Sequence, residues 1–149
     1  MLDIISSKST ETTVPTNHKE IYALSLNQVG VHSIDNGVKG RYEITNNDLR
    51  NIIAETGKDK YIRSIRGSLV PKIIEVLEKG EYAGWGLPDK GSHEEAACFV
   101  YYRIVFEQPV YLAMRYMKTE KVFKPYSFYS EENFRKYREE RVKKEIPTI

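Results

Sequence analysis

Residues 96–129 contain three segments in which apolar and polar side chains alternate, and this alternation restricts the chain to folds that contain a sheet. The expected strands are Ala96–Phe106, Val110–Lys118 and Val122–Tyr129. Successive side chains of a strand point to opposite faces, so alternation predicts strands with one face buried. Only Glu107–Pro109 separates the first two segments, which predicts an antiparallel hairpin.

The hairpin "CFVYYRIVFEQPVYLAMRY" carries four tyrosines and two arginines among its apolar residues. If Phe106 pairs with Val110, the register separates an aliphatic face from a polar aromatic one. The polar aromatic face would consist of Phe99, Tyr101, Arg103, Tyr111 and Arg115. Stacking a base on such a ring contributes about 1–3 kcal/mol and arginine neutralises phosphate, so this face suits single-stranded nucleic acid. Tyrosine and arginine also occupy ordinary half-buried sheet faces, and this structural interpretation stays open.

Three helices are expected around these strands. "ITNNDLRNIIAETG" has Thr45 as N-cap, Asp48 three residues later in a variant of the capping box, and Gly57 at its end. "VPKIIEVLEK" has a proline in its first turn and Gly80 just past its end. The last helix follows Ser130 and is expected to be mostly solvated. Its favourable i,i+4 pairs are Glu131–Arg135, Glu132–Lys136, Glu139–Lys143 and Glu140–Lys144.

The remaining segments complete the expected fold. Glu20–Leu26 alternates well enough for a short strand, and Asp35–Gly40 is expected to be a turn. Gly80–Glu95 contains four glycines and is expected to be a long loop. The sequence therefore predicts an α+β fold in which helices pack on one face of a twisted antiparallel sheet.

The 149 residues are enough for one domain. Met1–Asn17 is rich in Ser and Thr and lacks apolar periodicity, so we expect a mobile leader at residues 1–17 and a single domain at residues 18–149. No stretch has the roughly 18 apolar residues that a membrane span needs, and the start has no signal-peptide pattern. The expected location is the cytoplasm of the producing or target cell, with no membrane partner.

Charge and cysteine content limit the possible chemistry. The formal net charge of +2 does not by itself indicate nucleic-acid binding, but residues 97–149 hold eleven Lys and Arg against seven Glu. Cys98 is the only cysteine, which excludes an internal disulfide. Zinc-ligand spacing, clustered carboxylates and a G-x-S-x-G sequence are all missing. We therefore expect no metal and no cofactor.

"GRYEITNNDLRNII", "VPKIIEVLEKGEY" and the strand pair ending in "KPYSFYS" resemble nuclease-like domains of phage and polyvalent mobile-element proteins. These belong with the small metal-independent nucleases of the barnase, EndoU, colicin and RelE type (BECR fold). The resemblance covers roughly His32 to Tyr129. It implies a site in which a histidine precedes the first helix and a tyrosine with Thr or Ser lies on the last strand. The matching residues are His32, Tyr126 and Ser127.

Two further residues could join such a site. His93 lies in the Gly-rich loop before the first hairpin strand, and Lys124 provides a cation on the third strand. The chemistry implied by the resemblance is RNA cleavage by the neighbouring 2′-hydroxyl, which leaves a cyclic phosphate and needs no metal. A histidine with a pKa near 6.5 suits acid or base catalysis. Arg103, Arg115 or Lys124 would stabilise the developing charge.

Two functions follow as hypotheses. The first is RNA binding, with metal-independent endoribonuclease activity as a toxin, effector or mobile-element nuclease, and with RNA and a cognate inhibitor as partners. The expected substrate-binding residues are Tyr101, Arg103, Tyr111, Arg115 and Lys124. The alternative is a non-catalytic protein-interaction module, such as a phage accessory or immunity-type protein, whose tyrosine-rich sheet face binds a partner protein.

Overall fold

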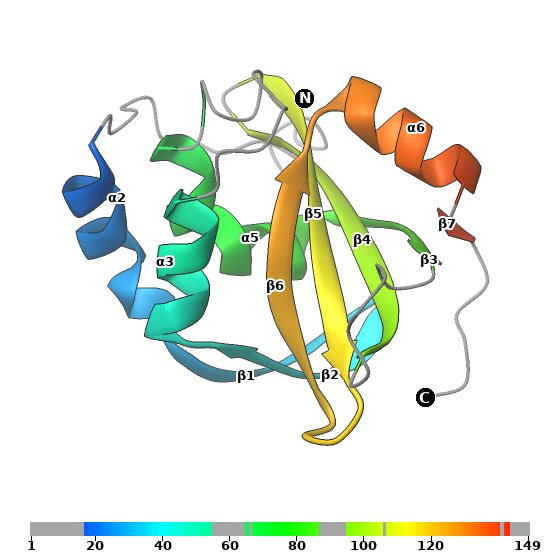
Figure 1. Ribbon diagram of the computed structural model, residues 1–149, viewed down its shortest axis with the longest axis horizontal. Coiled ribbons are helices and arrows are strands. Elements are labelled where there is room, and N and C mark those ends of the chain that lie inside the picture. The colour runs from blue at the N-terminus through cyan, green and yellow to red at the C-terminus, as the bar shows by residue number, and fades with distance from the viewer. Residues whose placement is uncertain are drawn as a thin grey trace.

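The computed structural model describes residues 17–54, 65, 67–86, 95–105, 107–140 and 142–143 (Figure 1). The helices are α2 (His18–Ser25), η1 (Leu26–Gln28), α3 (Asn46–Ala54), η2 (Val70–Lys72), α5 (Ile73–Lys79) and α6 (Glu131–Glu140). The strands are β1 (Gly30–Asn36), β2 (Val38–Ile44), β3 (Glu81–Gly86), β4 (Glu95–Val105), β5 (Gln108–Met117), β6 (Val122–Tyr129) and β7 (Val142–Lys143).

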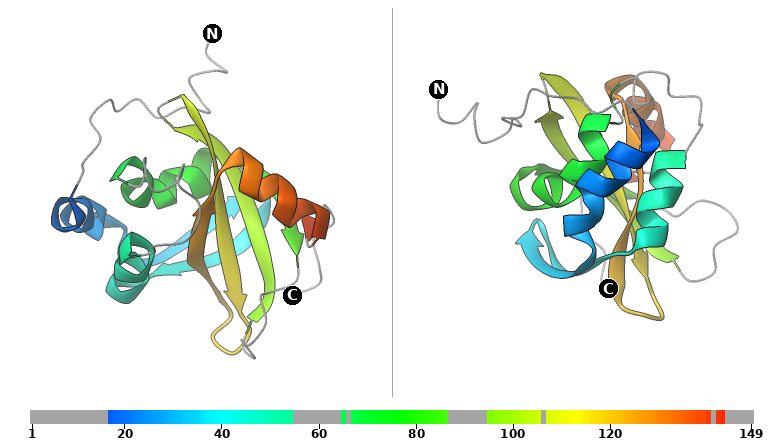
Figure 2. Two further views of the ribbon diagram at one scale, coloured as in Figure 1. Left: turned by 45° about the horizontal axis from the view of Figure 1, so that its top comes forward. Right: turned by 90° about the vertical axis from the view of Figure 1, so that its left-hand side faces the viewer.

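The strands form one curled sheet in the order β1-β2-β6-β5-β4-β3-β7. The predicted α+β class is confirmed, and the three strands expected in residues 96–129 form within one or two residues of their predicted bounds. One junction differs from an antiparallel sheet, because β2 and β6 run parallel. Figure 2 shows the sheet between α6 on one side and α2, α3 and α5 on the other. We call the face toward α2, α3 and α5 the inner face and the face toward α6 the outer face.

The predicted helix signals at α3 and α5 are confirmed where the structure describes them. The Thr45 amide donates to Asp48 Oδ2 at 2.9 Å, and the Asp48 amide donates to Thr45 Oγ1 at 3.1 Å, so the capping box is reciprocal. The segment with Pro71 begins as the short 3₁₀ helix η2 and continues as α5 up to Gly80. Gly57, expected to end the first helix, lies outside the described residues.

The strand predicted at Glu20–Leu26 is wrong, because these residues belong to α2 and the start of η1. Asn17 caps α2 by accepting a hydrogen bond from the Glu20 amide at 2.7 Å. Ile21 and Ser25 are buried while Ala23 between them is exposed, which fits the helical period and not the strand period. Asn17, assigned to the leader, therefore belongs to the folded part, and the rest of the predicted leader lies outside the described residues.

The sheet also gains strands where a turn and a loop were predicted. Asp35–Gly40 is the tip of the β1–β2 hairpin, and only Gly37, with φ of 87°, has turn geometry that favours glycine. The first residues of the loop predicted at Gly80–Glu95 form β3. Gly84 lies at an irregularity in the pairing of β3 with β4, which explains why the segment shows no regular alternation.

Helix α6 packs on the outer face. Phe134 is buried, and its ring stacks on Tyr111 with centroids 3.9 Å apart. The predicted pairs Glu131–Arg135 and Glu132–Lys136 form on its exposed side, each at 3.7 Å. The helix is thus solvated along one side and covers part of the sheet with the other.

Gly80 ends α5 where the chain passes against β4. An added Cβ would meet the carbonyl oxygen of Val76 and, at 2.7 Å, the carbonyl oxygen of Tyr102. We expect Gly80→Ala to lower the free energy of unfolding by about 1–3 kcal/mol, because two backbone segments must move apart. Urea denaturation measures the loss. The control is Lys79→Ala at an exposed position, and an equal effect of the two substitutions would contradict the close contact.

Candidate functional site

The observed register of the β4–β5 hairpin separates the residues expected on one polar aromatic face. Val105 pairs with Gln108, Arg103 with Val110 and Tyr101 with Leu112. The register was expected to place Arg103 opposite Ala113, so the pairing is shifted by three residues, and an odd shift reverses the face of one strand relative to the other. The prediction of a shared face is wrong. Its physical reason is the tighter turn, in which Glu107 adopts a φ of 65°.

Phe99, Tyr101 and Arg103 point to the inner face, and Tyr111 and Arg115 point to the outer face. The phenol of Tyr101 is fully buried and shares a hydrogen bond of 2.8 Å with Tyr42, whose hydroxyl also donates to the Val38 carbonyl at 2.6 Å. Tyr82 completes this group with its ring edge toward Tyr101, at a centroid distance of 5.9 Å. Burial raises the pKa of Tyr42 and Tyr82 to about 12, and burial also raises the pKa of Tyr101.

Arg103 is also an interior residue, with 2% of its side chain exposed. Its Nε donates to Glu75 Oε2 at 3.2 Å, which connects β4 to α5 across the core. A guanidinium in this position contacts a helix that covers the sheet. It therefore does not form part of an open ligand face.

Tyr111 lies under α6 on the outer face. Its hydroxyl donates to Glu131 Oε2 at 2.9 Å while its ring stacks on Phe134. Tyr102 packs beside it with ring centroids 5.0 Å apart. The two tyrosines thus support the C-terminal helix, and base stacking on Tyr111 would require α6 to move.

The predicted residues that stay close together are Arg115, Lys124 and Tyr126, which we call the Arg115 group. Arg115 and Lys124 are register partners, and the Arg115 guanidinium lies 3.4 Å from the Tyr126 ring centroid. Lys124 Nζ lies 3.2 Å from Glu43 Oε1 and 3.1 Å from Asp48 Oδ2. Burial works against the ammonium form, but the hydrogen bonds and charges of Asp48 and Glu43 raise the pKa of Lys124. Lys124 therefore anchors β6 to the start of α3.

The residues expected to act as acid, base and phosphate ligand do not converge. His32 pairs with Tyr42, so it points to the inner face, where its Nε2 lies 2.7 Å from the Gln28 carbonyl oxygen. Ser127 is buried and pairs with Ala113, which points to the outer face. His93 lies outside the described residues. The structure thus separates His32 from Ser127, and the catalytic roles of His32, Ser127, His93 and Tyr126 stay predictions.

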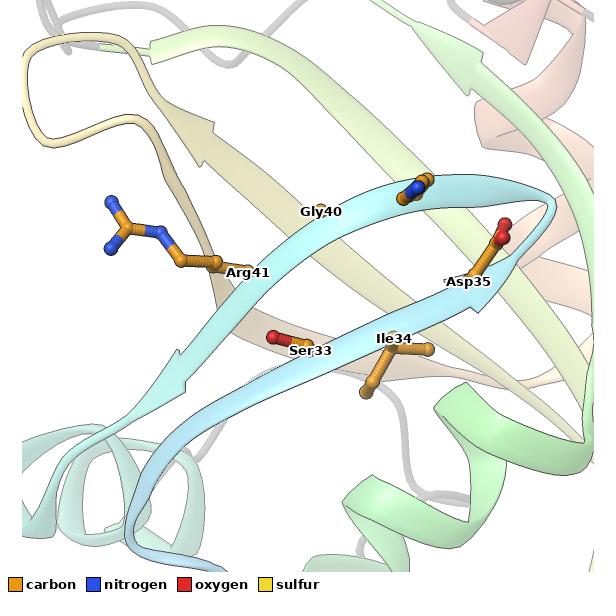
Figure 3. Close-up of a pocket in the computed structure, with 6 residues that line it drawn as sticks. Ser33, Ile34, Asp35, Gly40 and Arg41 are labelled. Carbon is orange, nitrogen blue, oxygen red and sulfur yellow. The ribbon is translucent and has the colours of Figure 1, made fainter.

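The β1–β2 hairpin carries a shallow hollow of about 260 Å³ (Figure 3). Figure 3 shows Arg41 projecting from the middle of β2 and Asp35 projecting near the tip of the hairpin, in different directions. The lining residues are Ser33, Ile34, Asp35, Lys39, Gly40 and Arg41. The charged side chains that line it are exposed, so they do not converge on a buried position as in an enclosed ligand site.

Sequence reasoning missed an exposed apolar surface between α2 and β1. The exposed large apolar side chains of the described residues are Leu24 (52%), Leu26 (44%), Val29 (40%) and Val31 (54%). All four lie within eight consecutive residues, and we call this set the apolar corner. Leu24 lies three residues after Ile21, a spacing that normally belongs to the buried side of a helix, so the sequence pattern does not mark Leu24 as exposed.

Metal-site geometry, helix hydrophobicity and comparison with known proteins do not assign a function to this chain. No cluster of three or more His, Cys, Asp or Glu side chains among them has the geometry to hold a metal ion. No described helix is long and apolar enough to cross a membrane. Comparison with protein-family models, curated proteins and solved structures finds no match to this chain. The resemblance to BECR-type domains therefore stays a prediction.

The buried tyrosines predict a loss of stability at alkaline pH. Because Tyr42 and Tyr82 have a pKa of about 12 in the folded state, they stay neutral at pH values where an unfolded tyrosine, with a pKa of about 10, ionises. A raised folded pKa gives stability that is complete below the unfolded pKa and is lost as the pH rises through the folded pKa. We expect the free energy of unfolding to fall between about pH 10 and 12.

Urea denaturation across this pH range, with tyrosinate absorbance as a second readout, tests the expectation. Tyr42→Phe removes one titrating group and should reduce the slope of stability against pH. Phe99→Leu is the control, because it alters the same core without changing a titrating group and should keep the parent slope. An unchanged slope in Tyr42→Phe would contradict the assignment.

Proposed function

We propose that the chain is a non-catalytic protein-interaction module that binds a partner protein through the apolar corner. The observation that carries the proposal is the exposure of four large apolar side chains, Leu24, Leu26, Val29 and Val31, within eight consecutive residues. Scattered exposed apolar residues are normal on proteins, whereas several together mark interaction surfaces.

The distribution of the other apolar residues supports this proposal. Within the described part of the chain, the remaining large aliphatic side chains are buried or half-buried, many of them in the core between the inner face and the helices. The apolar corner is therefore not a sign of a generally poor core. Its burial by a partner would contribute stabilisation of about 25 cal/mol per Å² of apolar surface removed from water.

The proposal contains no catalytic step. His32 and Ser127 point to opposite faces, and Lys124 is already neutralised by Glu43 and Asp48. General acid–base catalysis requires groups within hydrogen-bond reach of one reacting position. The described residues offer no such convergence of the predicted site.

A comparative capture experiment tests the interaction. Immobilised parent protein and the double variant Leu26→Lys, Val31→Lys are exposed to lysate of the source cell, and retained proteins are identified. The matched control is Asn27→Lys, Asn51→Lys, which adds the same charge at exposed polar positions of η1 and α3 without removing apolar surface. We expect the parent and the control to retain a partner that the corner variant does not retain. With the purified partner, the corner variant should bind at least about tenfold more weakly than the parent.

All three proteins should melt within about 2 °C of one another, since the substituted positions are exposed. Equal retention by the corner variant and the control would show that the apolar corner does not bind the partner.

RNA binding is the second candidate, and a group of basic residues at one end of strands β2 and β6 favours it. Lys39 and Arg41 precede Tyr42, which pairs with Phe123 near the start of the parallel strand β6, and Lys118 and Lys121 lie in the turn that leads from β5 into β6 (Figure 1). All four side chains are exposed, and no described residue forms an ion pair with them. Cations of this kind bind phosphate without reading sequence.

Incubation of the protein with total RNA in EDTA, followed by binding and end-group analysis, tests this candidate. If it holds, Lys39→Glu with Arg41→Glu weakens binding and makes the remaining binding less sensitive to salt than that of the parent. Arg135→Glu with Lys136→Glu makes the same charge change on α6, which follows the opposite end of β6, and should have no such effect. New cyclic phosphate ends would support the predicted cleavage. Absence of retained RNA at low salt would exclude the candidate.

A further inference from the structure

Strand β1 ends the sheet next to the apolar corner. It pairs with β2 along one edge, and its other edge pairs with no described strand. Backbone hydrogen bonds of the described residues outside regular elements do not use this edge either. An unpaired edge presents N–H and C=O groups that fit the backbone of an added strand.

The edge is held in place before any partner binds. The Asn36 side chain at the end of β1 donates to the carbonyl oxygens of Leu77 at 2.9 Å and Gly80 at 2.8 Å. His32 is held against the Gln28 carbonyl near the strand's start. A strand fixed at both ends loses little freedom when a second strand pairs with it.

The exposed side chains of β1 define what the added strand should carry. Val31, Ser33 and Asp35 alternate along its outer face and are all exposed. Residues directly opposite each other in a sheet interact, so an apolar residue suits Val31, a polar one suits Ser33 and a basic one suits Asp35. In antiparallel pairing, five successive residues of the partner strand, counted from its N-terminus, would be a basic residue, any residue, a polar residue, any residue and an apolar residue.

We infer that the partner binds by adding an extended segment of this pattern antiparallel to β1, with its apolar end beside the apolar corner. This inference rests on the proposed function and names the form of its partner. A second copy of the chain fits less well, because symmetric pairing along the whole of β1 is centred on Ser33 and sets Val31 against Asp35.

The probe is the synthetic peptide acetyl-Thr-Lys-Thr-Thr-Thr-Ile-Thr-amide, in which Lys, the central Thr and Ile would oppose Asp35, Ser33 and Val31. Its binding to the full chain is followed by the amide NMR signals of β1. We expect these signals to shift and their hydrogen exchange to slow. A peptide N-methylated at alternate residues on the pairing edge should bind about tenfold more weakly or worse.

Charge reversal separates strand addition from non-specific contact. The parent should prefer the lysine peptide over the same peptide with Glu by about two- to fivefold, and Asp35→Lys should reverse this preference. Lys39→Asp changes charge on the neighbouring strand and is the matched control, which should keep the parent's order of preference. A reversal requires a folded protein, so it cannot result from unfolding.

Several results would overturn the inference. These are no binding of the lysine peptide at millimolar concentration, equal binding of the N-methylated peptide, and an unchanged preference in Asp35→Lys. Concentration-dependent dimers with protected β1 amides would identify a second copy as the occupant instead. If capture depends on the apolar corner while the peptide fails, the proposed function stands and strand addition is wrong.

Discussion

The buried ring of Tyr42 connects the two parts of the sheet, and the position of the β1–β2 hairpin depends on it. The ring stacks on Phe123 of β6 with centroids 4.6 Å apart, and the hydroxyl reaches Tyr101 of β4 and Val38 in its own strand. Tyr42 is also the described residue through which the parallel β2–β6 junction pairs. Stacking and satisfied hydrogen bonds together make a polar phenol stable inside the core. These contacts hold β2 against β6 and β4.

This interior use of polar groups explains the tyrosines and arginines of the hairpin. Tyr101 and Arg103 bond to partners across the core, and Tyr111 supports α6 from the other face. Each has one polar atom satisfied and a large apolar body packed, which is the arrangement that makes such residues acceptable in a core. Composition alone cannot distinguish this use from a ligand face, because both require rings and donors on alternating positions.

The sequence predicts local features of this fold better than distant ones. Capping by Thr45 and Asp48 depends on residues three apart, and the strands at residues 96–129 show their own alternation, so both were predicted correctly. The face to which each hairpin residue points depends on the turn. The predicted loop was one residue too long and began one residue too late, so the predicted faces of the two strands were reversed relative to each other. The meeting of β2 with β6 and the separation of His32 from Ser127 depend on the whole topology, which no local pattern contains.

The parallel junction between β2 and β6 has a consequence for how the chain acquires its structure. Tyr42 and Phe123 are partners although most of the chain lies between them, and closing so long a loop costs conformational entropy before the contact forms. The β1–β2 hairpin and α3 are local structures that are synthesised first, yet they can dock only after β6 has left the ribosome. During that interval β2 exposes an edge that the finished protein covers. Late synthesis of β6 therefore makes the nascent chain most vulnerable to wrong strand pairing at the same hairpin that carries the free edge of β1.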